Sequence, residues 1–181
     1  MLYYPELTDG TISLRAWSLD DVPVVHRMVQ DPEIPRFLSI PPNHTIENVS
    51  KWIAGRDADL ATGRSVSLAI TDVGDGRLLG SVSLELSCAD DAIGEIGYWI
   101  AAEERGRGIA SAAVTLIEGW AFETLGLGRL EITTHPENQT SQRVALANGF
   151  REEGVLRAYR LHHGKRVDLV MFSKLPGDTR D

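Results

Sequence analysis

Hydrophobic and polar residues alternate in short segments along the chain, which is the period of a strand that buries one face. The first segment, TISLRAW, covers residues 11–17. Three more follow in succession: 65–71, 78–87 and 93–101. An Asp75-Gly76 pair between the first two of these three predicts a hairpin turn. The pattern therefore predicts an antiparallel meander before residue 102.

Between these strands the apolar residues recur every three or four positions, as in amphipathic helices. A first helix follows residue 17 with a cap at Ser18 or Asp20, and Pro23 favours the later start because proline is tolerated only in the first turn. Two longer helices are predicted as well: 45–61, capped by Thr45, and 108–126.

The last part of the chain alternates between both periods. It predicts a strand at 129–135, a short helix at 140–148 that is closed by Asn148-Gly149, and a final hairpin of two strands, 150–161 and 165–175. The resulting order is β-α-α-β-β-β-α-β-α-β-β, an α+β arrangement with a mostly antiparallel sheet. We expect a single domain at about 10–176, with short terminal extensions at 1–9 and 177–181.

Composition narrows the class of protein. The chain has 181 residues, of which 43% are hydrophobic and 24% charged, as in a globular protein. It lacks the roughly 20-residue apolar run of a membrane span and the signature of a secretory signal. Its net charge of −8 argues against nucleic-acid binding, and a single cysteine, Cys88, excludes an internal disulfide. We expect a soluble cytoplasmic protein with no metal and no membrane partner.

The segment EERGRGIASAAV, residues 103–114, places glycines and arginines at the start of a predicted helix. A helix N-terminus presents unpaired main-chain N–H groups and a partial positive charge. Gly106 and Gly108 leave those donors uncovered and permit loop conformations closed to other residues. Arg105 and Arg107 can neutralise an anion, so the segment predicts a pyrophosphate site.

A simpler interpretation is that the two glycines only turn the chain, while the arginines offset Glu103 and Glu104. Two better-known phosphate loops do not match. Ser111 stands where the dinucleotide fingerprint has its third glycine, and no Gly-Lys-Ser/Thr sequence follows for a P-loop.

This segment and its neighbours resemble the GCN5-related N-acetyltransferase (GNAT) superfamily, in particular its ribosomal-protein N-acetyltransferase (RimJ/RimL-like) branch. Three stretches carry the resemblance: EIGYWIAAEERGRGIASAAVTLIEGWAF, ITTHPENQTSQRVALANGF and REEGVLR. The resemblance covers about residues 10–176. The coenzyme loop of that family, Gln/Arg-x-x-Gly-x-Gly/Ala, is matched by Arg105, Gly108 and Ala110.

The resemblance implies a GNAT acyl-CoA N-acyltransferase fold and direct transfer of acetyl from acetyl-CoA to a primary amine. In the family, the strand before the loop parts from its neighbour and pairs its main chain with the coenzyme, and one N–H there stabilises the oxyanion. The implied coenzyme-binding residues are Tyr98, Trp99, Ile100, Arg105, Gly106, Arg107, Gly108, Ile109, Ala110, Asn138 and Ser141. For the side chains of Tyr98 and Trp99, ordinary strand packing is the alternative.

The attacking ammonium must lose a proton, usually to a carboxylate. Glu95, on the strand before the glycine loop, is our first candidate for this base, and Glu85 on the preceding strand is the second. His135 is a third, since imidazole titrates in a useful range. The alternatives are a solvated strand face for the glutamates and a polar strand end for the histidine.

Many family members protonate the departing thiolate with a tyrosine seven residues after the asparagine that matches Asn138, but this chain has Ala145 there. Ser141 is the candidate to approach the sulfur instead, and a helix-capping role is its alternative. The missing tyrosine also sustains a second hypothesis, a noncatalytic acyl-CoA-binding or interaction module with the same fold.

The acceptor is an amine, either a peptide N-terminus or a small molecule. We expect Phe37, Leu38 and Ile40 at its rim, in a proline-rich loop. The His162-His163 pair predicts a turn rather than a metal site, and Cys88 predicts a small packed side chain. The resemblance also allows a homodimer, which no residue pattern decides.

Overall fold

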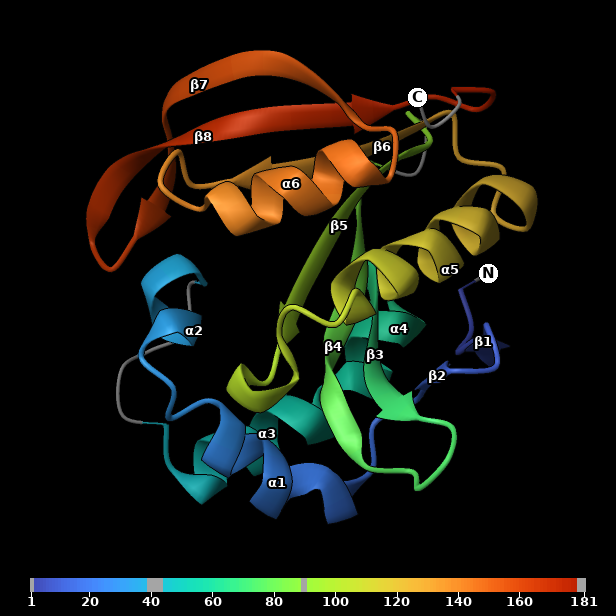
Figure 1. The fold of residues 1–181 in the computed structure, drawn as a ribbon, viewed down its shortest axis with the longest axis vertical. Coiled ribbons are helices and arrows are strands. Elements are labelled where there is room, and N and C mark those ends of the chain that lie inside the picture. The colour runs from blue at the N-terminus through green and yellow to red at the C-terminus, as the bar shows by residue number, and fades with distance from the viewer. Residues whose placement is uncertain (1, 39–43, 89–90, 179–181) are drawn as a thin grey trace.

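Eight strands form one sheet in the order β1-β2-β3-β4-β5-β6-β8-β7 in the computed structural model, which describes residues 2–38, 44–88 and 91–178 (Figure 1). Neighbouring strands are antiparallel except β5 and β6, which are parallel. The strands are β1 (Leu7–Thr8), β2 (Ile12–Arg15), β3 (Ser65–Asp72), β4 (Leu78–Cys88), β5 (Ile93–Ile100), β6 (Arg129–Thr134), β7 (Arg151–His162) and β8 (Lys165–Lys174). The predicted α+β class with a mostly antiparallel sheet is confirmed.

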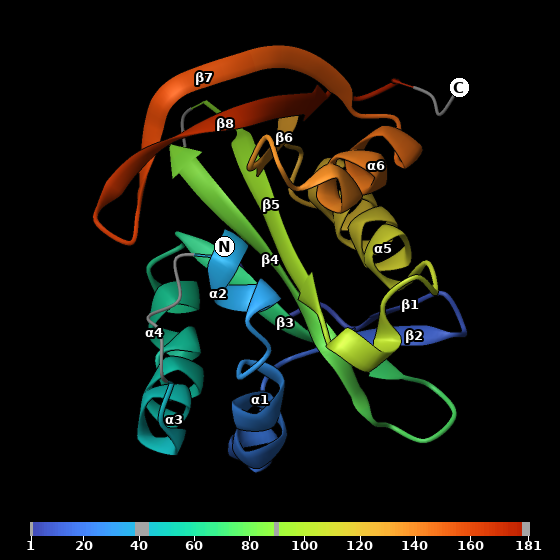
Figure 2. The same ribbon diagram turned by 60° about the vertical axis from the view of Figure 1, so that its left-hand side comes forward.

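Helices cover the two faces of this sheet (Figure 2). One face carries the long helices of the second half of the chain: α5 (Ile109–Glu123) and α6 (Gln139–Ala147). The other carries α1 (Val22–Met28), α2 (Glu33–Phe37), α3 (Ile46–Ala54) and α4 (Arg56–Ala61). Two short 3-10 helices, η1 (Leu19–Asp21) and η2 (Ala102–Glu104), lead into α1 and toward α5.

The alternation along β3 explains why the two faces differ in character. Val66, Leu68 and Ile70 are buried in the larger core, which also contains the inner face of α5. The intervening Ser67 and Ala69 point to the opposite face, because successive strand side chains alternate. There Ala69 belongs to a smaller core with residues of α1 and α3, and Ser67 accepts a hydrogen bond from Trp17 Nε1 at 3.2 Å.

Strands β5 and β6 pair over only three residues, from Ile93 opposite Arg129 to Glu95 opposite Glu131. Beyond this point β5 continues to pair with β4 and β6 with β8, but not with each other. The middle of the sheet is therefore open over residues 96–100 of β5, which leaves one edge of that strand without a strand partner.

Several predicted boundaries are wrong. Residues 2–9 of the predicted extension are not loose, because Leu7 pairs with Leu14 across β1 and β2 and Tyr4 packs against the core. The predicted helix at 45–61 is two helices, α3 and α4, separated at Gly55. Its cap is confirmed, since the Thr45 side chain accepts a hydrogen bond from the Asn48 N–H at 3.2 Å.

Helix α2 was not predicted, because it has five residues and contains Pro35, and so shows no helical period. Ser18 caps η1 rather than α1, and the first α-helix begins at Val22 with Pro23 in its first turn. Proline is accommodated there because the first N–H groups of a helix have no partner within it. The α-helix therefore begins well after Ser18, as Pro23 favours, but its N-cap is Asp21 and neither of the predicted caps, Ser18 or Asp20.

Candidate active site

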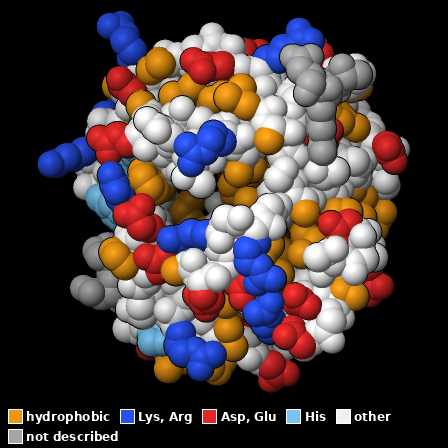
Figure 3. Space-filling view, in the orientation of Figure 1, with side chains coloured by type: hydrophobic (Ala, Val, Ile, Leu, Met, Phe, Trp, Pro, Cys, Tyr) orange, Lys and Arg blue, Asp and Glu red, His pale blue; other side chains and the backbone are white. Residues whose placement is uncertain are grey.

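A cleft of about 1010 Å³ opens where β5 and β6 separate. The N-terminus of α5 and residues along the length of α6 line one side of it, while α2, α3 and the β7–β8 hairpin line the other. Figure 3 shows a hollow in this face of the molecule, bordered by hydrophobic side chains and by charged side chains of both signs.

The glycine loop enters the cleft at the start of α5. Gly106 and Gly108 have φ angles of +75° and +78°, which L side chains rarely adopt. A Cβ atom at either position would meet nothing within 4 Å, so the backbone conformation, not crowding by the protein, requires glycine. Gly108 is the N-cap of α5 and supplies no side-chain cap. The first N–H groups of α5 therefore have no intrahelical partner, and Ile109 and Ala110 line the cleft beside them.

The two arginines of this loop have different surroundings. Arg105 lines the cleft, where its Nε donates to the Ile100 carbonyl at 3.1 Å and its Nη2 to Asp31 at 2.5 Å. Arg107 does not line the cleft and pairs with Glu104. Arg107 is thus the one predicted coenzyme-binding residue that the structure places outside the lining, and the simpler interpretation, an arginine offsetting a neighbouring glutamate, describes it correctly.

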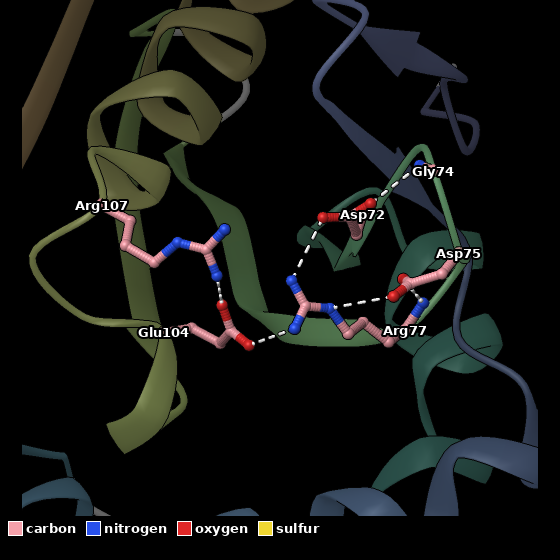
Figure 4. Close-up of polar contacts among 6 residues, drawn as sticks. All are labelled: Asp72, Gly74, Asp75, Arg77, Glu104 and Arg107. Atoms are coloured by element: carbon pink, nitrogen blue, oxygen red, sulfur yellow. Dashed lines mark hydrogen bonds and ion pairs between the residues drawn. The ribbon is translucent and has the colours of Figure 1, made fainter.

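Glu104 connects the glycine loop to the β3–β4 hairpin (Figure 4). Its carboxylate is buried and accepts hydrogen bonds from Arg107 and, at 2.7 Å, from Arg77 Nη1. Arg77 also pairs with Asp72 and Asp75, at 3.3 Å each. The Gly74 N–H and then Arg77 hold the pKa of the Asp72 carboxyl below its usual range. Glu104 lines the cleft while Arg77 and Arg107 do not, so the network ties the base of the loop to the β3–β4 hairpin behind it.

The open edge of β5 presents main-chain groups at alternate residues. The Ala101 N–H donates to Leu79 on β4, and the Ile100 carbonyl instead accepts from Arg105 on the other side. By the alternation of an antiparallel pair, the main chain of Tyr98 and Ile100 faces the gap, whereas that of Trp99 faces β4. The Trp99 side chain lines the cleft on the side of α1–α4.

Helix α6 brings Asn138 and Ser141 to the opposite wall of the gap. Asn138 is the N-cap and its side chain accepts from the Ser141 N–H at 3.1 Å, so its capping role is confirmed. Ala145 is fully buried against the core. Thr134, at the end of β6, also lines the cleft; its buried Oγ1 has no hydrogen-bond partner among the described residues.

Ser141 also contacts Tyr98 across the gap. The Tyr98 hydroxyl lies 2.9 Å from Ser141 Oγ and donates to the Ser141 carbonyl oxygen at 3.1 Å. Burial raises the pKa of Tyr98 to about 12, against the opposing effect of the hydrogen bond with Ser141. Sequence reasoning missed this pair because the two residues lie on different elements and nothing in either local pattern connects them.

Glu95 lines the cleft, but both of its carboxylate oxygens are engaged. Oε1 accepts from Thr133 Oγ1 at 2.5 Å, and Arg160 Nη2 lies 2.8 Å from Oε2 and 3.0 Å from Oε1. Burial opposes the charge of Arg160, but the hydrogen bonds and charge of Glu95 more than compensate and raise the pKa of the guanidinium. An incoming amine would therefore have to displace Thr133 or Arg160 to reach this carboxylate.

Glu85 lies directly opposite Glu95 in the register of β4 and β5 and also lines the cleft. No hydrogen bond or ion pair to its carboxylate is recorded within the described residues, although its charge contributes to raising the pKa of Arg160. Two carboxylates and one guanidinium therefore leave this part of the cleft with a net negative charge, which favours a cationic acceptor.

His135 follows β6 and belongs to an aromatic cluster. Its ring lies 5.7 Å from Phe37 of α2 and 4.8 Å from His162, which in turn lies 4.2 Å from His163. Burial, and then the neighbouring His162, lower the pKa of His135, so its imidazole is neutral near pH 7. His163 contacts the Pro35 carbonyl at 2.8 Å and thereby joins the hairpin to α2. The predicted turn is present at residues 163 and 164, but no local pattern indicates that His162 meets His135.

Sequence reasoning also missed a group of hydroxyls that lines the half of the cleft beside α2 and α3. They lie on β3 and β4, at the strand positions that alternate with the larger core: Ser65, Ser67, Ser81 and Ser83. The signal was present in SVSLAIT and SVSLELS, where serine occupies every second position of a strand whose other face is apolar.

The remaining expectations have mixed outcomes. Phe37 and Leu38 line the cleft, while Ile40 lies outside the described residues, as does the side chain of Cys88 at the end of β4. Among the described residues, no group of three or more His, Cys, Asp or Glu is placed to hold a metal ion. Every helix in the described part of the chain is too short or too polar to cross a lipid bilayer.

Comparison with known proteins gives a consistent result. Residues 11–151 match the family model described as an acetyltransferase (GNAT) domain. An uncharacterized N-acetyltransferase p20 from Bacillus licheniformis is 27% identical over 164 residues, covering 91% of this chain and 92% of that protein. The putative ribosomal N-acetyltransferase YdaF from Bacillus subtilis is 41% identical over 101 residues, 56% of this chain and 55% of its own.

Among solved structures, RimJ from Mycobacterium smegmatis in complex with CoA-disulfide has a TM-score of 0.85. It is 24% identical and matches 99% of this chain and 89% of its own, so it supports the fold.

Proposed function

Because the chain belongs to the GNAT acetyltransferase family and is therefore an N-acetyltransferase, we propose that it transfers an acetyl group directly from acetyl-CoA to a primary amine. One observation carries the proposal. The uncovered N–H groups at the glycine-opened start of α5 and the unpaired edge of β5 lie in the same cleft. Such a cleft offers donors for a diphosphate at one end and for an extended amide-bearing arm along the strand.

The residues fit a coenzyme of this kind. The space beside Gly106 and Gly108 is open, and within the described residues the buried Thr134 hydroxyl beside the gap has no hydrogen-bond partner. We propose that the amides of residues 106–110, together with Arg105, bind the pyrophosphate, while Asn138 stays at the cap of α6 beside the arm. Arg107 acts through Glu104, as a support of the loop.

Bound acetyl-CoA supplies an activated acyl group, and the protein must orient an amine toward it and stabilise charge on the carbonyl oxygen. The N–H groups of Tyr98 or Ile100 face the gap and are the proposed donors to that oxygen, whereas Trp99 contributes its side chain to the acceptor side. Ser141 Oγ is the proposed contact to the sulfur, in place of the tyrosine that Ala145 replaces.

We assign removal of the amine proton to His135 instead of our first candidate, Glu95. His135 lines the cleft, its lowered pKa keeps it neutral near pH 7, and its ring nitrogens have no recorded hydrogen-bond partner in the described part of the chain. In this scheme Glu95 orients Arg160, and Glu85 attracts the acceptor ammonium before it is deprotonated. A general base contributes about 10²–10⁴-fold to the rate.

The acceptor enters between α2 and the β7–β8 hairpin and meets the serine hydroxyls of β3 and β4. We propose a polar primary amine, either the α-amine of a peptide or a small molecule. Hydroxyl donors and acceptors beside Glu85 suit an acceptor that carries hydrogen-bonding groups next to its amine.

The test is acetyl-CoA turnover, followed as release of free CoA thiol, on a panel of N-terminal peptides, polyamines, aminoglycosides and amino acids. We expect thiol release that depends on an amine and an acetylated product of the corresponding mass. Tight binding of acetyl-CoA with no turnover on the entire panel would favour the noncatalytic module instead.

A further inference from the structure

The contact between Tyr98 and Ser141 joins the two walls of the open gap. Tyr98 lies on β5 and Ser141 in the first turn of α6, 43 positions apart in the chain. Three atoms of Ser141 are held: its N–H by Asn138 Oδ1, its carbonyl oxygen by the Tyr98 hydroxyl, and its Oγ by the same hydroxyl. A serine side chain on a helix ordinarily chooses among staggered rotamers, so this contact selects one of them.

We propose that Tyr98 is a positioning residue for the transfer step, which holds Ser141 Oγ so that its hydrogen points at the departing sulfur. This inference rests on the proposed function, since it assigns a role toward the thiol of coenzyme A. It also explains how the chain manages with Ala145, because the tyrosine hydroxyl reaches the site from β5 instead of from α6.

The two hydroxyl groups can exchange donor and acceptor roles by rotation of their O–H bonds, with no movement of heavy atoms. A phenol has one O–H donor, and in the structure it is shared between the Ser141 carbonyl and Ser141 Oγ. When the phenol O–H donates to the carbonyl oxygen, the serine O–H donates to the phenol oxygen. When the phenol donates to Oγ, the serine hydrogen is released to point elsewhere in the cleft. Only the second state offers a donor to the sulfur.

No proton has to leave the tyrosine. As the C–S bond breaks, its electron pair goes to sulfur while the acetyl carbon bonds the amine nitrogen, and the serine O–H donates a hydrogen bond to the thiolate. The thiolate then takes its proton from solvent. Burial raises the pKa of Tyr98 to about 12, so the phenol keeps its proton, and with it the donor, up to mildly alkaline pH.

The experiment measures binding, so that it does not depend on finding an acceptor. Calorimetry compares coenzyme A with desulfo-coenzyme A, in which hydrogen replaces the thiol, at pH 7 and pH 9. For the wild-type protein we expect a preference for coenzyme A that grows to about tenfold at pH 9, where a larger fraction of the thiol is ionised and accepts a stronger hydrogen bond than at pH 7.

In Tyr98→Phe and in Ser141→Ala this preference should fall to about twofold or less, as expected on removal of one hydrogen bond, while the affinity for desulfo-coenzyme A is unchanged. The double variant should match Ser141→Ala, because Tyr98 acts through Ser141. Tyr4→Phe is the matched control: its hydroxyl bonds Asp57, at 2.9 Å, and Tyr4 does not line the cleft.

A Tyr98→Phe protein that retains the full preference, or loses affinity for both ligands equally, overturns the positioning role and leaves the proposed function intact. A wild-type protein that binds neither ligand overturns both. Once an acceptor is known, kcat of Tyr98→Phe should fall about tenfold with the KM for acetyl-CoA unchanged.

Discussion

The two sides of the cleft differ in whether main-chain or side-chain groups line them. On the side of α5 and α6, the proposed coenzyme site consists mainly of main-chain groups: the N–H groups after Gly106 and Gly108 and the open edge of β5. On the proposed acceptor side, side chains dominate, contributed by α2, the faces of β3–β5, the end of β6 and the β7–β8 hairpin. A main-chain site needs glycines at particular positions, whereas a side-chain site needs several distant elements to meet.

The two sides should therefore tolerate different kinds of amino-acid substitution. On the coenzyme side, most side chains can vary as long as the backbone keeps its path. On the proposed acceptor side, we expect single side chains to determine the chemistry. The variants below test this division, beginning with the largest expected effect.

Replacing His135 by Gln should have the largest effect, on the acceptor side alone. Loss of the proposed base should lower kcat about 10²–10⁴-fold with the KM for acetyl-CoA unchanged. In the wild-type protein, activity should rise with pH as the imidazole loses its proton, with a midpoint below the ordinary histidine value of about 6.5, because burial and His162 lower the pKa of His135.

The matched control is His163→Gln, a neighbouring imidazole that does not line the cleft. Retention of more than a tenth of the activity by His135→Gln would return the assignment to Glu85 or Glu95, and Glu95→Gln would then be the variant to compare.

Replacing Gly108 by Val should impair the coenzyme side. A side chain at φ +78° strains the backbone and covers the first N–H groups of α5. We expect the affinity for acetyl-CoA, measured by calorimetry, to fall about a hundredfold, which corresponds to the loss of one or two hydrogen bonds to a charged group.

Gly119→Ala is its control within the same helix, since Gly119 has no positive φ and a Cβ there meets nothing within 4 Å. It should leave binding unchanged and raise stability slightly, because alanine is the better helix former. Equal affinity of Gly108→Val and wild type would contradict the main-chain character of the site.

Replacing Glu104 by Gln should act mainly on stability. Glu104 is 5% exposed and connects Arg77 to Arg107, so the variant loses charge-assisted hydrogen bonds inside the molecule. We expect a decrease of about 2 kcal/mol in the free energy of unfolding, measured in urea, with a smaller decrease in affinity for acetyl-CoA. The exposed neighbour Glu103→Gln should change neither quantity, and an equal effect of both variants would show that the buried network is not what supports the loop.

Acidification should have the smallest effect, and again on the acceptor side. Burial, followed by a neighbouring histidine, lowers the pKa of both His135 and His162 in the folded chain. The unfolded chain therefore binds protons first, and the stability that these residues contribute is complete above their unfolded pKa of about 6.5 and declines as pH falls through it.

We expect Tm to decrease by a few degrees between pH 7 and pH 5, and the decrease to be smaller in a variant with both histidines replaced by Gln. An unchanged slope in that variant would place the pH dependence elsewhere, for example at His44, whose pKa burial also lowers.

The division also explains what the sequence could predict. Strands β2 to β5, helix α5 and the loop at Gly106 and Gly108 were predicted correctly, because period and glycine chemistry are local, whereas the two-residue strand β1 was missed. Alternation alone, however, does not show that β5 and β6 pair over three residues and then separate. Helix α2 was missed since five residues around Pro35 carry no period.

Local sequence patterns did not predict which side chains contact each other across the fold. Glu95 was the first choice of base because of its place on a strand, but Arg160 and Thr133, 65 and 38 positions away, occupy its carboxylate. Tyr98 was given ordinary packing as an alternative, and its contact with Ser141 spans two elements. Such contacts follow from the tertiary fold, and no spacing rule predicts them.

The most direct test of the main-chain site is the crystal structure of the protein with coenzyme A. The account predicts pyrophosphate oxygens about 2.7–3.2 Å from main-chain nitrogens of residues 106–110, with the arm of the coenzyme along the edge of β5 at Tyr98 and Ile100. A pyrophosphate bound elsewhere, or held by side chains with those nitrogens unoccupied, would contradict it.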